Sequence, residues 1–240
     1  MQTRSSPLRK PSVIVDPLLG ADRAVALSYV SARRRAALHA LWAIDAAMGD
    51  VVRTSREPML GQIRLAWWRE RLEELDAGGP PPAEPRLQEV ALALVPLGIT
   101  GRKLASLEGP WLRLFEPFPW DIRIAEAIWF RGRYLFALAG RLLGSPDERL
   151  EQAGGLWAIT DAARHCSDQA SRGMLMEHGR TLARGLNGAR FAVPLRPLSM
   201  LAALAFRDIR AGEPFEQQGA PGRLAAMLAH RLSGRLPKIV

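Results

Sequence analysis

The chain has 240 residues, 48% of them hydrophobic, including seven tryptophans and seven phenylalanines, so it can fill a sizeable core and is not disordered throughout. Its single cysteine, Cys166, excludes an internal disulfide, and without C-x-x-C or H-E-x-x-H patterns a structural zinc site has no support. The net charge of +9 favours anionic partners such as phosphates or acidic lipid headgroups, although a biased composition explains the arginine surplus equally well.

Residues 1–20 are predicted to form a loose basic arm, because Pro7, Pro11 and Pro17 interrupt any regular element. The short apolar run in this arm ends at Asp16, so it lacks the apolar core of a secretory signal. No uninterrupted apolar stretch of about 18 residues occurs, which argues against a membrane-spanning helix. We expect a cytoplasmic location, with peripheral contact to the inner face of the membrane left open.

Helical periodicity then dominates the first third of the chain. A long helical pattern runs over 22–48, with a short break expected near Ser31. A second helix is predicted over 56–77. Its Trp67 and Trp68 are adjacent, so only one of the two rings can face the core fully.

A loop of two glycines and three prolines at 78–82 ends this pattern. Helices are predicted next over 84–95 and 100–115, and Pro110 should kink or split the second of them. An aspartate N-cap then starts a strong helical pattern over 122–143.

Four more helical patterns follow, over 147–166, 171–184, 195–211 and 221–233. No alternating strand pattern, internal repeat or long linker interrupts the series. The sequence therefore predicts an all-α protein in which residues 21–240 form one domain, a bundle of about eight or nine helices.

Two segments carry more information than periodicity. Residues 35–44 read RAALHALWAI and are followed by DVV at 50–52, and residues 57–72 read EPMLGQIRLAWWRERL. The first resembles the R-x-A-L-x-A-L-Y-A-F…D-D-I-V-D helix of the squalene/phytoene synthase family. The second resembles the next family helix, most closely in a divergent branch that reads S-E-P-M-L-G-x-I-R-L-Q-W-W-R-D-x-L and includes a mitochondrial respiratory complex I assembly factor. The resemblance implies an isoprenoid-synthase-like helical bundle.

Three weaker similarities follow in the same order as in the family. Residues 131–140 resemble its Y-x-x-V-A-G helix, residues 155–164 its G-x-A-x-Q-L-T-N-I-L-R-D segment, and residues 189–194 its G-R-x-Y-L-P segment. The resemblance covers about 22–235, and only the stretch Met59–Leu72 is specific by itself.

Synthases of this family join two prenyl diphosphates head to head. The resemblance implies two Asp-rich helix segments that face each other and hold Mg²⁺ ions against the diphosphate. Mg²⁺ prefers hard oxygen ligands, commonly one or two carboxylates together with substrate phosphates, and it neutralises charge on the departing diphosphate. Carboxylates spaced i, i+4 share a helix face, so a D-x-x-x-D spacing presents both to one cavity.

The first Asp-rich motif falls on residues 49–53, GDVVR, where it is degenerate. Gly49 and Arg53 stand at the two metal-facing positions, so one carboxylate is absent and the other is replaced by a positive charge. Asp50 remains between them on a different face and is a candidate catalytic residue. Asp45 lies one turn earlier and is a candidate substitute metal ligand.

The second motif falls on residues 161–169, DAARHCSDQ, where His165 and Gln169 replace the paired aspartates. Asp161, His165 and Asp168 share one helix face and complete the candidate metal set. Asp161 and Asp168 are also candidate catalytic residues. The alternative, which we favour, is a polar helix face with a His–Asp hydrogen bond.

The resemblance also supplies candidate contacts to a diphosphate, which are four arginines and one tyrosine that match family positions. They are Arg35, Arg53, Arg164, Arg190 and Tyr134.

The losses in both motifs favour a divergent, non-catalytic or altered family member that acts as an assembly or lipid-handling helper at a membrane. The alternative is an active head-to-head prenyltransferase of isoprenoid or carotenoid biosynthesis, which would be a Mg²⁺-dependent prenyl diphosphate transferase. Mg²⁺ is expected only under that alternative. A nucleic-acid-binding bundle has charge alone in its favour, so we do not expect a nucleic-acid partner.

The expected partners are an isoprenoid diphosphate or another lipid, a membrane surface, and a further protein. A prenyl chain needs an apolar tunnel, for which the small residues of 134–143 and 153–163 are the candidate lining. The basic last helix, with Arg231 and Arg235, can lie on an acidic membrane or dock on the bundle.

Overall fold

The computed structural model describes residues 19–239. The predicted basic arm therefore lies almost entirely outside the described residues. At its end, Leu19 is buried and the first helix begins at Gly20.

The prediction of an all-α protein is confirmed, since the described residues contain helices and a single isolated β-bridge but no strand. They form eleven α-helices, more than the eight or nine expected, together with four short 3₁₀ helices. The α-helices are α1 (Gly20–Ser28), α2 (Ala32–Thr54), α3 (Pro58–Glu74), α4 (Pro85–Ala93), α5 (Gly101–Ala105), α6 (Glu108–Leu112), α7 (Ile122–Leu142), α8 (Glu148–His165), α9 (Gln169–Gly185), α10 (Arg196–Ala211) and α11 (Pro221–Ser233). The 3₁₀ helices are η1 (Leu75–Ala77), η2 (Val95–Leu97), η3 (Arg113–Phe115) and η4 (Val193–Leu195).

Two breaks account for the extra helices. The chain leaves helical geometry between α1 and α2, around the expected position Ser31. The pattern over 100–115 divides into α5, α6 and η3, but the division falls at Ser106 and Leu107, while Pro110 lies inside α6. Proline is tolerated there because the first turn of a helix needs no partner for its missing N–H.

Aspartate side chains start three of the long helices. Asp121 accepts a hydrogen bond from the backbone N–H of Arg123 at the start of α7, and Asp147 does the same for Arg149 in α8. Asp168 caps α9 in this way. Such caps satisfy N–H groups that have no partner within the helix.

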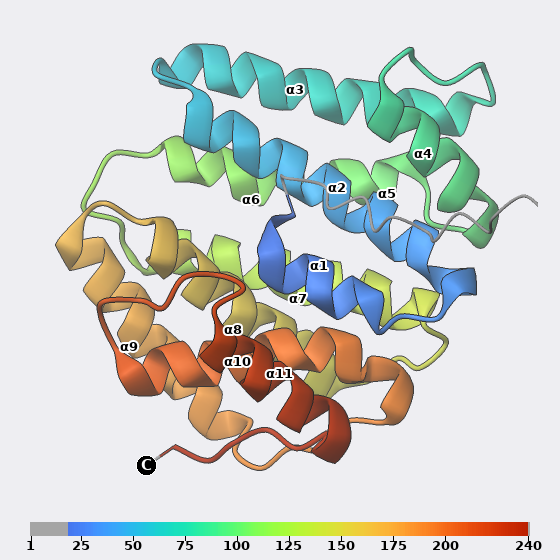
Figure 1. Ribbon diagram of the computed structural model, residues 1–240. Helices are drawn as coiled ribbons and strands as arrows, with labels where there is room; N and C mark the ends of the chain where they lie inside the picture. Colours follow the sequence, from blue (N-terminus) through green and yellow to red (C-terminus); the bar gives the residue numbers. More distant parts are fainter. Residues whose placement is uncertain (1–18, 240) are drawn as a thin grey trace, which may run out of the picture.

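The helices α7 and α8 form the centre of the bundle, as the ribbon in Figure 1 shows, with α2 and α3 on one side of them and α10 and α11 on the other. Glycines allow α7 and α8 to approach closely. A Cβ atom at Gly132 would lie 2.2 Å from the carbonyl oxygen of Gly154, and one at Gly154 would lie 2.3 Å from that of Gly132. One cluster of buried apolar side chains extends from α1 to the segment after α11.

The adjacent tryptophans of α3 divide as predicted, since Trp68 is buried and Trp67 is exposed. The last helix, α11, docks on the bundle through Met227, Arg223 and His230. Within residues 19–239, no single helix is long and apolar enough to cross a membrane; the pair Pro85–Leu97 and Gly101–Phe115 meets the criterion only together and is bent by 117°.

Candidate functional site

A cavity of about 670 Å³ lies between the two segments in which the sequence suggested Asp-rich motifs. Its walls come from α1, α2, the start of α3, α6, α7, α8 and the segment 114–120, which begins in η3 and runs toward α7. Most of the lining is apolar, and the charged groups lie on α1, α2, α7 and α8, apart from Glu116 in the segment 114–120. The apolar lining includes Ala46, Val52, Pro58, Trp111, Leu114, Phe115, Phe118, Trp120, Ile128 and Ala162.

The inner wall holds a buried ion pair between Asp45 of α2 and Arg131 of α7. Nη1 of Arg131 lies 2.7 Å and 2.8 Å from the two carboxylate oxygens of Asp45. Trp111 of α6 donates its indole N–H to Asp45 over 3.1 Å, and the guanidinium of Arg131 stacks 4.0 Å from the same ring. We call Asp45, Arg131 and Trp111 the Asp45 cluster.

Asp45 therefore does face the cavity, but its carboxylate is already neutralised. The side chain is 1% exposed, and Arg23 of α1 approaches its other side at 3.6 Å. A carboxylate in this state would have to lose its guanidinium partner before it could bind a cation. Separating a buried pair leaves an uncompensated charge, which is strongly unfavourable.

Trp111 also occupies the space beside the first metal-facing position. A Cβ atom at Gly49 would lie 2.8 Å from Cη2 of Trp111, closer than real Cβ atoms approach another atom. Position 49 thus lacks a carboxylate, and the indole ring of Trp111 fills the space that a side chain there would occupy.

The other metal-facing position carries Arg53, which lines the cavity with an exposed side chain. Arg53 pairs with Asp50 over 2.5 Å, and Asp50 itself is not part of the cavity wall. A guanidinium at this place repels metal cations and attracts anions. The arrangement fits an anionic headgroup better than a cation.

The opposite wall carries Asp161 and His165 on α8. Nδ1 of His165 hydrogen-bonds the carbonyl oxygen of Asp161 at 2.8 Å and lies 3.8 Å from its carboxylate. Cys166 lies beside them, and burial raises the pKa of its thiol, which keeps it protonated. Among the candidate site residues on this wall, Asp161 has the carboxylate that is most available to a ligand.

Asp168 is not part of this wall. Its carboxylate accepts hydrogen bonds from the backbone N–H and the hydroxyl of Ser171, at 2.8 Å and 2.6 Å, as the N-cap of α9. These bonds hold the pKa of Asp168 below its usual value. Helix α8 ends at His165, so Asp168 lies outside it and does not share a helix face with Asp161 and His165.

The other predicted diphosphate contacts do not gather around the cavity. Arg35 donates to the carbonyl oxygens of Ser28 and Val30 at the end of α1, and Arg190 is an exposed residue bridged through its backbone to Arg235. Tyr134 stacks on Phe130, and burial raises the pKa of its phenol. Of the five candidates, Arg53 alone lines this cavity.

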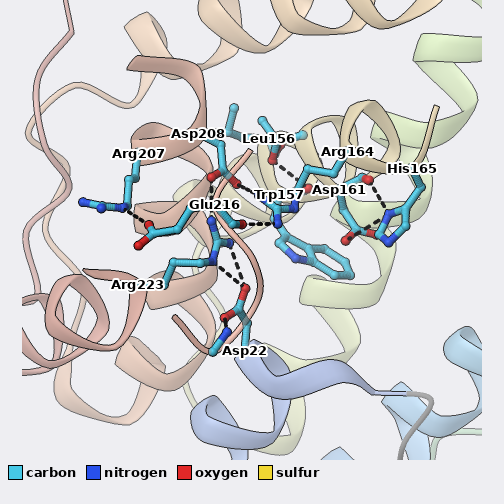
Figure 2. A network of polar contacts seen from close by, with 12 residues as sticks. Asp22, Leu156, Trp157, Asp161, Arg164, His165, Arg207, Asp208, Glu216 and Arg223 are labelled. Carbon is cyan, nitrogen blue, oxygen red and sulfur yellow. Dashed lines mark hydrogen bonds and ion pairs between the residues drawn. The ribbon is translucent and has the colours of Figure 1, made fainter. Parts of the chain in front are cut away.

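Arg164 belongs to a polar network next to the cavity, which Figure 2 shows from close by. It pairs with Asp208 of α10 at 3.1 Å and donates to the carbonyl oxygen of Glu216. Arg223 of α11 joins the same Asp208 to Asp22 of α1. Burial raises the pKa of Asp208, and the two guanidinium groups oppose that shift. This network links four helices, so Arg164 has a structural role here.

The cavity follows a different course from the tunnel that the sequence suggested. None of the residues 134–143 lines it, and only Asp161 and Ala162 come from 153–163. The close contact of Gly132 with Gly154 explains this, because it brings the backbones of α7 and α8 together and leaves no room between them.

The residues around the cavity do not fit a magnesium cluster. Among residues 19–239, no group of three or more His, Cys, Asp or Glu side chains is arranged to hold a metal ion. Asp45, Asp161 and His165 line the same cavity, but Asp45 is bound to Arg131, and Asp168 caps a helix outside it.

Sequence reasoning missed Arg131 and Trp111 as parts of the site. Arg131 lies in a segment that resembles a family helix, but its partner is 86 positions away along the chain. A single buried arginine opposite a cavity aspartate is a signal that appears only when the helices are placed in space.

The comparison with protein families finds one match. Residues 19–123 match the family model described as squalene/phytoene synthase. The match includes the positions of the first Asp-rich motif and ends before those of the second. No curated protein and no solved structure shows a significant match to this chain.

Proposed function

We propose that this chain, which carries a squalene/phytoene synthase family domain over residues 19–123, binds a lipid in its central cavity without the family's magnesium-dependent condensation chemistry. In this role it is a lipid-handling or assembly helper at a membrane. The observation that carries the proposal is the Asp45 cluster, an ion pair and an indole ring in the wall where a synthase would present carboxylates to Mg²⁺.

The size and lining of the cavity support a lipid ligand. A volume of about 670 Å³ lies in the range of small-molecule binding sites. Phe115, Phe118 and Ile128 provide apolar contact for a hydrocarbon chain, and Arg53 provides a positive charge for an anionic head. An amphiphile with one anionic end satisfies both parts of the site.

The charges of the site support the absence of metal-dependent catalysis. Arg23, Arg53 and Arg131 all line the cavity; Asp45 offsets the charge of Arg131, and the guanidinium groups of Arg23 and Arg53 raise the cost of placing divalent cations there. Apart from Asp45, the lining has the carboxylates of Asp161 and Glu116, and Glu116 pairs with Arg113, which leaves too few ligands for the cluster of ions that two diphosphates require.

A turnover assay tests the catalytic part of the proposal. Recombinant protein is incubated with farnesyl or geranylgeranyl diphosphate, Mg²⁺ and NADPH, and released diphosphate is measured. We expect no release above background. Magnesium-dependent turnover would support the alternative, an active head-to-head prenyltransferase, and Asp161→Ala would then abolish it while leaving helical content unchanged.

Lipid retention tests the binding part separately. Mass spectrometry of the purified protein is expected to identify a lipid that co-purifies in stoichiometric amount. The variant Ala162→Phe places a ring in the cavity and should lose that lipid, whereas Ala170→Phe, at an exposed position of α9 outside the cavity, should retain it. Equal lipid contents in both variants would contradict the proposed site.

A further inference from the structure

Helix α3 carries two apolar faces. Gly61, Leu65, Trp68 and Leu72 face the core at helical spacing. The opposite face presents Met59, Leu60, Ile63 and Trp67, which are 72%, 53%, 59% and 42% exposed. We call these four exposed residues the α3 stripe. A helix on the surface of a soluble bundle normally shows polar residues there, so the stripe calls for a partner.

The α3 stripe lies beside the mouth of the cavity. Ser55 and Pro58, at the entry to α3, line the cavity, and Pro58 directly precedes the stripe. Phe118 from the segment 114–120 also lines the cavity, and it is 46% exposed. Figure 1 shows α3 along the outer edge of the bundle, with the helices of the core on its other side. The exposed apolar surface is thus continuous with the opening of the apolar cavity.

Charge is distributed unevenly along the same helix. Arg56 and Arg64 are exposed next to the stripe, and Arg53 is exposed at the cavity mouth. The acidic residues of α3 come at its other end, from Glu70 to Glu74. With Arg53, Arg56 and Arg64 against the single exposed Glu57 at the N-cap, the end of α3 near the mouth is apolar with a basic excess, which matches the surface of an anionic bilayer.

We propose that the α3 stripe docks this protein on an acidic lipid bilayer, with Met59, Leu60 and Ile63 inserted among the headgroups. Arg53, Arg56 and Arg64 contact the anionic headgroups around them. In this orientation the cavity mouth faces the membrane, so a lipid can enter without crossing water. The transfer of lipid rests on the proposed function, whereas docking itself depends only on the stripe and its arginines.

The bilayer is favoured over a protein partner by the connection between the stripe and the cavity. A lipid ligand resides in membranes, and its apolar part is costly to expose to water on the way to the site. A protein seated on the same stripe would cover the mouth.

The helix α11 offers a rival surface for membrane contact, because Leu224, Leu228 and Leu232 are exposed on it and its end is basic.

Vesicle flotation tests this assignment. The full chain is mixed with vesicles of phosphatidylcholine and phosphatidylglycerol, or of phosphatidylcholine alone, and the fraction that floats is measured. We expect binding to the acidic vesicles, weakened by salt. The triple variant Met59→Gln, Leu60→Gln, Ile63→Gln should bind at least about tenfold more weakly, because it removes the inserted apolar groups. The single variants Arg56→Gln and Arg64→Gln should each weaken binding roughly fivefold.

A matched control uses the rival surface, with Leu224→Gln, Leu228→Gln and Leu232→Gln on α11. This variant should float like the unmodified protein. The assignment is overturned if the unmodified protein does not bind acidic vesicles, or if the α3 variant binds equally well. It is also overturned if the α11 variant alone loses binding, or if the α3 stripe instead mediates a dimer that the triple variant abolishes.

The two proposals fail in different ways. Flotation on vesicles of defined composition reports docking even when the cavity is blocked by Ala162→Phe. Loss of the co-purifying lipid in that variant, with flotation intact, supports both. If the unmodified protein floats normally but never carries lipid, the proposed function is refuted and the docking surface stands.

Discussion

At the residue scale, the pairing of Asp45 with Arg131 decides what the cavity can bind. Both side chains are almost completely buried, and one guanidinium nitrogen contacts both carboxylate oxygens. We expect Arg131→Met to lower the free energy of unfolding by about 3 kcal/mol, because it leaves the buried Asp45 without its closest cation, with Arg23 at 3.6 Å and the Trp111 N–H as its remaining partners. Urea denaturation followed by circular dichroism measures this change.

The matched control is Arg53→Met, which breaks the exposed ion pair with Asp50 at the other end of the same motif. Exposed pairs contribute little, so its effect should stay within about 1 kcal/mol. Equal losses in the two variants would contradict the structural role given to Arg131.

Gly49 provides a second test at this scale. Gly49→Asp restores a carboxylate at a metal-facing position, but its Cβ meets the ring of Trp111. We expect a loss of about 1–3 kcal/mol in unfolding free energy, as in other overpacked sites. Combining it with Trp111→Ala should recover part of the Gly49→Asp penalty. A Gly49→Asp variant as stable as the unmodified protein would show that the ring is not fixed in place.

A buried histidine gives the molecule a defined pH response. His230 accepts a hydrogen bond from Ser199 and donates to the carbonyl oxygen of Arg235, and burial lowers its pKa to about 4. In the unfolded chain a histidine has a pKa of about 6.5. Between these values the unfolded chain binds more protons, so stability is full above about pH 6.5 and falls by up to about 3 kcal/mol as the pH drops toward 4.

Urea midpoints measured across that pH range test this response. His230→Gln keeps a donor and an acceptor but does not titrate, so it should reduce the slope; burial also lowers the pKa of His178, which contributes a smaller slope of the same sign. A slope that persists undiminished in His230→Gln would assign the response to another group.

At the scale of elements, the contact of α7 with α8 sets the shape of the interior. Gly154→Ala would force a methyl group to within 2.3 Å of the carbonyl oxygen of Gly132, so we expect a loss of about 3 kcal/mol or more. Gly173 is the matched control, because a Cβ there meets nothing within 4 Å. Gly173→Ala should stabilise the protein by about 0.5–1 kcal/mol, and thermal unfolding distinguishes the two. Similar melting temperatures would mean that the helices separate at little cost.

The extent of the helices could be read from the sequence, because apolar periodicity and capping aspartates are local signals. Asp121 marked the start of α7, and the break near Ser31 was visible in the pattern. The division of 100–115 at Ser106 was not, since the proline at 110 was the stronger local signal. The packing of neighbouring helices decides such short breaks.

At the scale of the whole molecule, the site could be predicted only in part. The degenerate motif positions Gly49, Arg53, Asp161 and His165 do face one cavity. The partners that give the cavity its character come from distant segments, as Arg131 and Trp111 do for Asp45. Asp168 followed the right spacing but lies beyond the end of α8, so helical periodicity could not place it.

The network around Asp208 shows the same dependence on long-range contact. Arg223 connects Asp22 near the start of the described chain to Asp208 in α10, and it is buried between them. Arg164 reaches the same aspartate from α8. The family resemblance assigned Arg164 to phosphate, whereas the fold gives it two protein partners.

On the proposed function, the cavity binds an amphiphile without help from divalent cations. Calorimetric titration with farnesyl diphosphate, in Mg²⁺ and again in EDTA, tests it most directly. We expect dissociation constants that agree within about threefold, because the guanidinium groups of the cavity supply the positive charge. Binding that tightens by about tenfold or more in Mg²⁺, and loses this gain in Asp161→Ala, would contradict it.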